Sequence, residues 1–153
     1  MDIEIYEVGP RDGLQNSNFK LSTFSKVQLI NELFFAGLKN MEIGSFVHPK
    51  YVPSMADSKE VFLQTKDLGD FDVLIPNQKG FDNAKEVGAK NFNVFFSPSK
   101  EFNKRNLNRS LEDKFHELDE MLSDIDRKNV RAYISCAFGC PFEGRPKEHA
   151  LKN

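Results

Sequence analysis

The segment Glu7-Val-Gly-Pro-Arg-Asp-Gly-Leu-Gln15 contains the residue types best suited to chemistry in this chain. Pro10 and the two glycines predict a bend directly after an apolar strand, from which three polar side chains would project. Asp12 could bind a hard divalent cation, and Arg11 could stabilise a developing oxyanion. The spacing alone is equally typical of an ordinary turn that is capped by Asp12 and leaves Arg11 in solvent.

A second acidic side chain, Glu42, falls in a short segment that is otherwise apolar. A carboxylate inside a buried strand needs a cationic partner, because an unpaired buried charge is costly. Arg11 is the candidate for that partner. The alternative places Glu42 at the end of its strand, in solvent.

Short apolar runs alternate with longer amphipathic segments, and this alternation predicts the elements that position these residues. Right-handed βαβ units in a parallel sheet, an α/β fold in one domain, are the expected arrangement. Strands are predicted at Ile3–Val8, Asn40–Ile43, Asp72–Ile75, Asn91–Phe96 and Val130–Cys136.

Helices are predicted where apolar residues recur at spacings of three and four. Ser22 or Thr23 caps the first helix and Gly37 lies near its end. Ser110 and Asp113 form a signal like a capping box for a later helix. Weaker helices are expected at Lys59–Lys66 and Phe81–Val87. The later helix is expected to bury a stripe of Leu111, Phe115, Leu118, Leu122 and Ile125.

Polar loops follow all five predicted strands. Because functional residues of parallel sheets gather at the carboxyl ends of the strands, these loops would form one edge of a binding site. They are Gly9–Asn16, Gly44–Pro53, Pro76–Gly80, Ser97–Asn103 and Ala137–Gly144. Lys100, Lys104 and Arg105 either meet the phosphates of a ligand or belong to a solvated loop.

Five segments, taken together, resemble the 3-hydroxy-3-methylglutaryl-CoA lyases, a family within a metal-dependent superfamily of lyases and synthases. The segments are collinear over nearly the whole chain: Glu7–Gln15, Met41–Met55, Ile75–Phe81, Ser99–Asn106 and Tyr133–Gly144. The resemblance implies a (β/α)8 barrel. Since such a barrel typically takes about 250 residues, we expect residues 1–153 to be a single, incomplete barrel domain of about five βα units, lacking the C-terminal strands.

The resemblance also implies roles for individual residues. Asp12 would be a metal ligand, Arg11 would stabilise the enolate oxygen of the thioester product, and Glu42 would belong to the network that holds Arg11. The residues implied to bind the substrate, besides Arg11, are Gln15, Ser45, Asn77, Tyr133 and Ser135.

The implied reaction is a retro-Claisen cleavage of 3-hydroxy-3-methylglutaryl-CoA to acetoacetate and acetyl-CoA, with Mg2+ or Mn2+ as cofactor. One aspartate cannot fill about six ligand positions, and the HxH pair and the Gly-rich cysteine loop that the resemblance implies are absent from this sequence. We therefore expect the chain alone to be inactive. The alternatives are a lyase or aldolase for a related 3-hydroxyacyl-CoA, and a non-catalytic fragment or subunit.

Composition restricts the partners and the location. The 21 basic and 23 acidic residues predict no nucleic-acid or anionic-membrane surface, and no apolar run approaches the roughly 18 residues of a membrane span. The absence of a signal segment favours the cytoplasm. An acyl-CoA substrate, self-association and a complementary C-terminal barrel fragment are the expected partners. Cys136 is predicted in a buried strand and Cys140 in a loop, without a structural zinc site.

Overall fold

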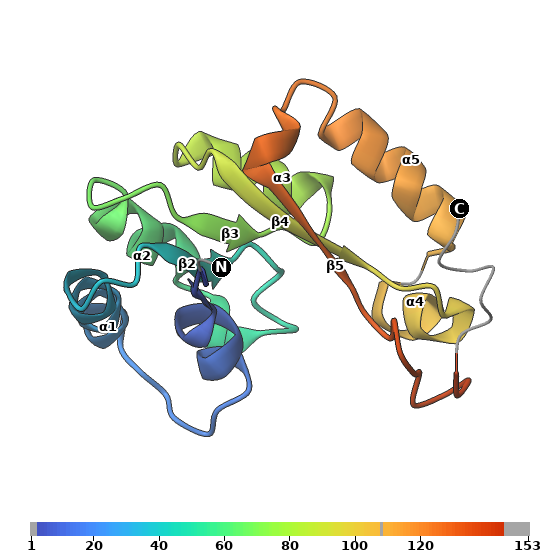
Figure 1. The fold of residues 1–153 in the computed structure, drawn as a ribbon, viewed down its shortest axis with the longest axis horizontal. Coiled ribbons are helices and arrows are strands. Elements are labelled where there is room, and N and C mark those ends of the chain that lie inside the picture. The colour runs from blue at the N-terminus through green and yellow to red at the C-terminus, as the bar shows by residue number, and fades with distance from the viewer. Residues whose placement is uncertain (1–2, 108, 146–153) are drawn as a thin grey trace. The chain divides into compact units, whose positions relative to one another are not determined.

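The computed structural model describes residues 3–107 and 109–145, and the chain divides into two compact units, residues 1–93 and 94–153. Five strands follow one another in the sheet order β1-β2-β3-β4-β5 (Figure 1). They are β1 (Tyr6–Glu7), β2 (Asn40–Ser45), β3 (Asp72–Leu74), β4 (Asn91–Phe96) and β5 (Val130–Ile134).

The strand pairs of the first unit are parallel: β1 with β2, β2 with β3, and β3 with β4. The β4 strand continues into the second unit, where the backbone N–H of Ser135 donates to the carbonyl of Phe96 at 2.8 Å. The predicted α/β class and the parallel pairing are therefore confirmed.

Each of the first three helices follows a strand of the first unit. They are α1 (Thr23–Phe35), α2 (Ser58–Thr65) and α3 (Gln78–Glu86). Ser22 caps α1 by accepting the N–H of Ser25 at 3.1 Å, and Gly37 takes a φ of 104° just beyond its end, as the sequence predicts. Helices α1 and α2 pack together, and α2 packs on β2 (Figure 1). The core side chains, each at most 4% exposed, include Ile30, Met41, Ile43, Val61, Phe62, Val73 and Phe81.

The second unit holds α4 (Lys100–Leu107) and α5 (Leu111–Met121). The capping box predicted at the start of α5 is confirmed, because Ser110 accepts the N–H of Asp113 and Asp113 accepts that of Ser110. The loop predicted through Asn103 is wrong, because α4 begins at Lys100. Ser99 starts this helix by accepting the N–H of Phe102 at 3.0 Å.

The buried face of α5 differs from the predicted stripe. Leu118 is buried, but Phe115 is 38% exposed, and Lys114 and Met121 take the buried positions instead. A buried lysine is tolerated here because its Nζ donates to Glu117 at 2.9 Å. The other predicted stripe residues are half-buried: Leu111, Leu122 and Ile125.

Four strands have other bounds than those predicted, and β3 differs least, ending at Leu74 instead of Ile75. Only two residues of the expected Ile3–Val8 strand pair with β2, and Ile3 and Ile5 stay 87% and 61% exposed. The β2 strand runs beyond Ile43 because Ser45 still pairs with β3. The β5 strand stops at Ile134, since Cys136 takes a φ of 61°, outside the β region.

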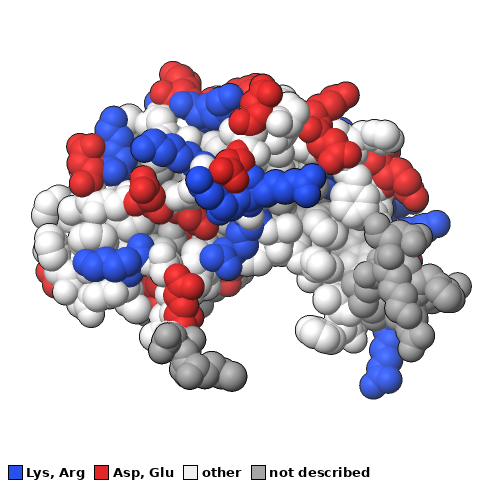
Figure 2. All heavy atoms as spheres, turned by 45° about the horizontal axis from the view of Figure 1, so that its top comes forward, with Lys and Arg blue, Asp and Glu red and all other residues white. Residues whose placement is uncertain are grey.

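Acidic and basic side chains are interspersed over the face that Figure 2 shows. This mixture is what a chain with 21 basic and 23 acidic residues predicts. Within the described ranges, no helix combines the length and the apolar character needed to cross a bilayer.

Candidate active site

The turn after β1 is a π-helical turn over Gly9–Gly13. The carbonyl of Val8 accepts three backbone N–H groups in succession, from Arg11 at 3.1 Å, Asp12 at 2.7 Å and Gly13 at 3.3 Å. Pro10 suits this first turn, since it has no N–H to satisfy. The predicted bend is present, and it directs Arg11 into the molecule.

The Arg11 guanidinium lies between two carboxylates, those of Asp12 and Glu42. Its Nε donates to Oε1 of Glu42, and its Nη1 donates to Oδ1 of Asp12 at 2.7 Å. The side chain of Arg11 is 10% exposed and that of Glu42 is fully buried. The ion pair expected from the sequence is therefore formed, and the alternatives that leave either residue in solvent are wrong.

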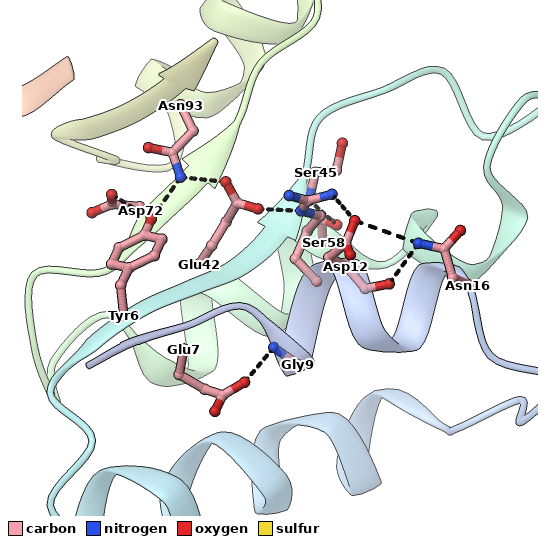
Figure 3. Close-up of polar contacts among 11 residues, drawn as sticks. Tyr6, Glu7, Gly9, Asp12, Asn16, Glu42, Ser45, Ser58, Asp72 and Asn93 are labelled. Carbon is pink, nitrogen blue, oxygen red and sulfur yellow. Dashed lines mark hydrogen bonds and ion pairs between the residues drawn. The ribbon is translucent and has the colours of Figure 1, made fainter. Parts of the chain in front are cut away.

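The second carboxylate oxygen of Glu42 accepts a hydrogen bond from Nδ2 of Asn93. The same amide nitrogen donates to the Tyr6 hydroxyl at 2.6 Å, and that hydroxyl donates to Asp72 at 2.6 Å (Figure 3). Sequence reasoning missed Asn93 and Tyr6. The available signal was Asn93 itself, an amide in the middle of a predicted apolar strand.

The Asp12 side chain is half exposed, with its Oδ1 also 3.4 Å from Nδ2 of Asn16. Among residues 3–107 and 109–145, no three His, Cys, Asp or Glu side chains form a group that could hold a metal ion. One carboxylate does not meet the roughly six oxygen donors that Mg2+ requires. The described residues thus do not fit a complete divalent-metal site, and no step through a metal follows from them.

Ser45 and Gln15 each hold a buried polar atom without a hydrogen-bond partner in the described structure, Oγ and Oε1 respectively. The backbone N–H of Ser45 donates to Oγ of Ser58 at 3.0 Å, which fixes the end of β2 against the start of α2. Gly44 permits this approach, because a Cβ there would lie 3.0 Å from the Ser58 side chain. Such buried, unsatisfied atoms are suited to binding polar groups of a ligand.

Asn77 has a structural task in this chain. Its Oδ1 caps α3 by accepting the N–H of Gly80 at 3.0 Å, and its side chain is exposed. Tyr133 and Ser135 belong to the second unit, where both are half-buried while Ile134 between them is 48% exposed. Because successive residues of an extended chain point to opposite sides, this alternation places Tyr133 and Ser135 on the same side.

The two thiols of the second unit differ in environment. Cys136 lies after β5 and is half-buried, so the prediction of a buried strand position is wrong. Burial, and then the neighbouring thiol of Cys140, hold the pKa of Cys136 above its ordinary value. Burial would also raise the pKa of Cys140, but hydrogen bonds from Ser99 and the following backbone N–H groups leave it lowered.

The parallel α/β architecture, with charged residues where β1 ends and along β2, defines a barrel-type α/β protein. The HMGL-like family model matches residues 2–153, and the chain belongs to that family. The mitochondrial hydroxymethylglutaryl-CoA lyase of Macaca fascicularis is 46% identical over 147 residues, covering 94% of this chain and 45% of that protein.

A 3-hydroxy-3-isohexenylglutaryl-CoA/hydroxymethylglutaryl-CoA lyase of Pseudomonas aeruginosa is 42% identical over 146 residues, which is 93% of this chain and 49% of that protein. The structure of an HMG-CoA lyase from Acinetobacter baumannii in complex with coenzyme A and 3-methylmalate superposes with a TM-score of 0.88 at 35% identity. The superposition covers 97% of this chain and 50% of the Acinetobacter baumannii chain. The chain thus spans about half the length of the relatives it matches, and its fold is part of a (β/α)8 barrel.

Proposed function

We propose that this chain is the part of a carbon–carbon lyase that binds and stabilises the thioester end of 3-hydroxy-3-methylglutaryl-CoA during retro-Claisen cleavage to acetoacetate and acetyl-CoA. The observation that carries the proposal is the buried Arg11 guanidinium, held between Glu42 and Asp12. Relatives of this chain in the same family are named as hydroxymethylglutaryl-CoA lyases. The residues 1–153 form one incomplete barrel domain in this proposal.

In the cleavage a base takes the proton from the C3 hydroxyl, and C3 becomes the ketone of acetoacetate. The electron pair of the broken C2–C3 bond passes into the enolate of acetyl-CoA, which an acid then protonates at C2. Before this protonation, negative charge develops on the thioester oxygen of the enolate. Arg11 stabilises this charge, because a guanidinium in a water-poor site interacts strongly with a nearby oxyanion. Glu42 keeps Arg11 in place and holds its charge against the cost of burial.

The remaining predicted residues orient the substrate. Ser45 and Gln15 contribute the buried atoms Oγ and Oε1, which have no partner among the described residues. Tyr133 and Ser135 contact the acyl group. Asn77 donates a hydrogen bond to the substrate from its Nδ2, since only its Oδ1 takes part in the cap of α3. Each of these contacts raises the fraction of bound substrate held in a reactive geometry.

A divalent cation, Mg2+ or Mn2+, would be the cofactor of a completed barrel, where it would supply Lewis-acid polarisation of the substrate oxygens. Asp12 supplies one ligand, since its carboxylate is half exposed at the site. The other ligands come from residues outside those described. For this reason we propose that the chain is inactive by itself and acts as part of a completed barrel. We also propose that it acts in the cytoplasm.

A related 3-hydroxyacyl-CoA is the second candidate substrate. The relative from Pseudomonas aeruginosa is named for both isohexenyl and methyl substrates, so the shared family does not restrict the acyl group. Arg11 would act on the thioester end, which is common to both. A non-catalytic subunit is the third candidate.

Apolar side chains of the second unit favour a protein partner over isolation. Phe138, Ile134 and Phe142 are 97%, 48% and 46% exposed. Exposed apolar surface of this kind is typical of interaction sites. A complementary barrel fragment or a second copy of the chain would cover this surface. For the acyl-CoA substrate, the support is that the superposed Acinetobacter baumannii structure is a complex with coenzyme A.

A chimera tests the proposed activity. In it, this chain replaces the segment of the Pseudomonas aeruginosa lyase with which it aligns, and release of acetyl-CoA is measured with Mg2+. We expect turnover by the chimera and none by the isolated chain. A folded chimera that binds coenzyme A but releases no acetyl-CoA from either acyl-CoA would reject the lyase proposal.

A further inference from the structure

We propose that Asn93 and Tyr6 are positioning residues for Arg11 and act through Glu42. The inference rests on the proposed function, in which Arg11 meets the developing oxyanion. Neither residue belongs to the motifs that indicated the site in the sequence, and each reaches it from another strand than that of Glu42, Tyr6 from β1 and Asn93 from β4.

The first argument is that both oxygens of the Glu42 carboxylate accept a hydrogen bond. Oε1 accepts from Nε of Arg11, and Oε2 accepts from Nδ2 of Asn93. Because one donor holds each oxygen, rotation of the carboxylate breaks at least one hydrogen bond. Glu42 and Asn93 are both 0% exposed, so water does not replace a lost donor there.

The second argument is that the direction of the hydrogen bonds is determined. The Tyr6 hydroxyl donates its only proton to Asp72, so its oxygen accepts the second proton of the Asn93 amide nitrogen. Turning the amide over would place an amide oxygen against the Glu42 carboxylate, two acceptors facing each other. The charges of Glu42 and Asp72 therefore fix the orientation of the amide between them (Figure 3).

The third argument is that the network joins four strands, each through one residue. Tyr6, Glu42, Asp72 and Asn93 belong to β1, β2, β3 and β4. The Glu42 carboxylate is thus held by strand-borne groups, whereas Arg11 lies in a turn. Rigid elements hold a group more closely than loops do, so the strands transmit their geometry to Arg11 through Glu42.

The test is the hydrogen exchange of the Arg11 Nε–H, measured by 15N NMR on the full chain. The Arg11 resonance is assigned by its absence in Arg11→Lys. Arg105 serves as an internal reference, since its Nε donates to Glu101 at 2.7 Å on α4. We expect Asn93→Leu to accelerate Arg11 exchange about tenfold, the effect of one lost hydrogen bond, and Tyr6→Phe to accelerate it less. Arg105 exchange stays unchanged.

Asn91→Leu is the matched control. Asn91 lies two residues earlier on β4, and its Nδ2 donates to the carbonyl of Asp70 at 2.9 Å, away from Glu42. Unchanged Arg11 exchange in a folded Asn93→Leu protein would overturn the proposal, as would an equal acceleration in Asn91→Leu. Where Asn93→Leu does not fold, Tyr6→Phe decides: Arg11 exchange identical to that of the unmodified chain overturns the proposal.

This measurement is independent of turnover. Accelerated Arg11 exchange in Asn93→Leu, together with an inactive chimera, would reject the proposed lyase function and support the positioning role. Unchanged Arg11 exchange in Asn93→Leu, together with an active chimera, would reject the positioning role and support the lyase function.

Discussion

Glu42, which is wholly buried on β2, accepts the Nε–H of Arg11 from the turn that follows β1. The pair joins the turn after β1 to the middle of β2 through a charge-assisted hydrogen bond. Asp12 takes the other side of the same guanidinium at 2.7 Å. One cation thus has two carboxylate neighbours, one buried and one half exposed, which hold the guanidinium in one orientation.

Removing one partner of this pair should destabilise the protein strongly. Glu42→Ala leaves Arg11 buried without its counter-charge, and we expect a loss of about 3–5 kcal/mol in the free energy of unfolding. Urea denaturation measures the difference. Glu86→Ala is the control, because the Lys59–Glu86 pair is exposed and should contribute less than about 1 kcal/mol. Equal losses in the two variants would contradict the buried role of Glu42.

Asp57 should make stability depend on acidic pH. Burial by itself raises the pKa of Asp57, but hydrogen bonds from Lys26 and Thr23 and the charge of Lys26 leave it below the ordinary 3.8. A lowered folded-state pKa means that the stabilisation is complete above the unfolded pKa and is lost as the pH falls through the folded one.

The unfolding free energy of the unmodified chain minus that of Asp57→Asn, measured across the acidic range, should therefore decrease as the pH drops below about 4. Asp70→Asn is the control, since Asp70 is exposed and 3.9 Å from Lys90. A difference that is independent of pH would show that Asp57 stabilises the chain without its charge.

Gly80 should not tolerate a side chain. A Cβ at this position would lie 2.7 Å from the carbonyl oxygen of Phe46 and 2.8 Å from the Pro76 ring. We expect Gly80→Ala to lower the unfolding free energy by about 1–3 kcal/mol, the usual effect of overpacking. Gly139→Ala, with no atom within 4 Å of the added Cβ, is the control in the same thermal or urea experiment. Equal stability of the two variants would contradict the close approach.

The isolated chain should bind divalent metal weakly. One half-exposed carboxylate at Asp12 implies a dissociation constant for Mn2+ above about 1 mM. Paramagnetic broadening of NMR signals should centre on the Gly9–Gly13 turn and disappear in Asp12→Asn. Micromolar affinity that survives this substitution would place the metal elsewhere.

The Arg11–Glu42 pair could be predicted from sequence because a carboxylate within an apolar strand demands a cation. Asn93 was missed because a neutral amide makes no such demand, and its two bonding partners come from other strands. The strand segments and the capped helices α1 and α5 were predictable from local patterns, since caps and spacing act within a few residues.

Other features depended on contacts that local patterns do not contain. The face of α5 was ambiguous because apolar spacings of three and four fit two adjacent stripes, and the structure buries Lys114 in place of Phe115. Helix α4 carries too few apolar residues to show a stripe. The β5 strand ends before Cys136 because this residue has a positive φ, which a cysteine rarely adopts.

The most direct test of the account is kcat of the chimera carrying Arg11→Lys. Lysine retains the positive charge but loses the forked donors that reach Glu42 and Asp12 together. We predict that kcat falls by about 10²–10³-fold while coenzyme A binding is retained, as for other lost oxyanion contacts. A chimera whose kcat is unaffected by Arg11→Lys would contradict the assignment of Arg11 to the developing oxyanion.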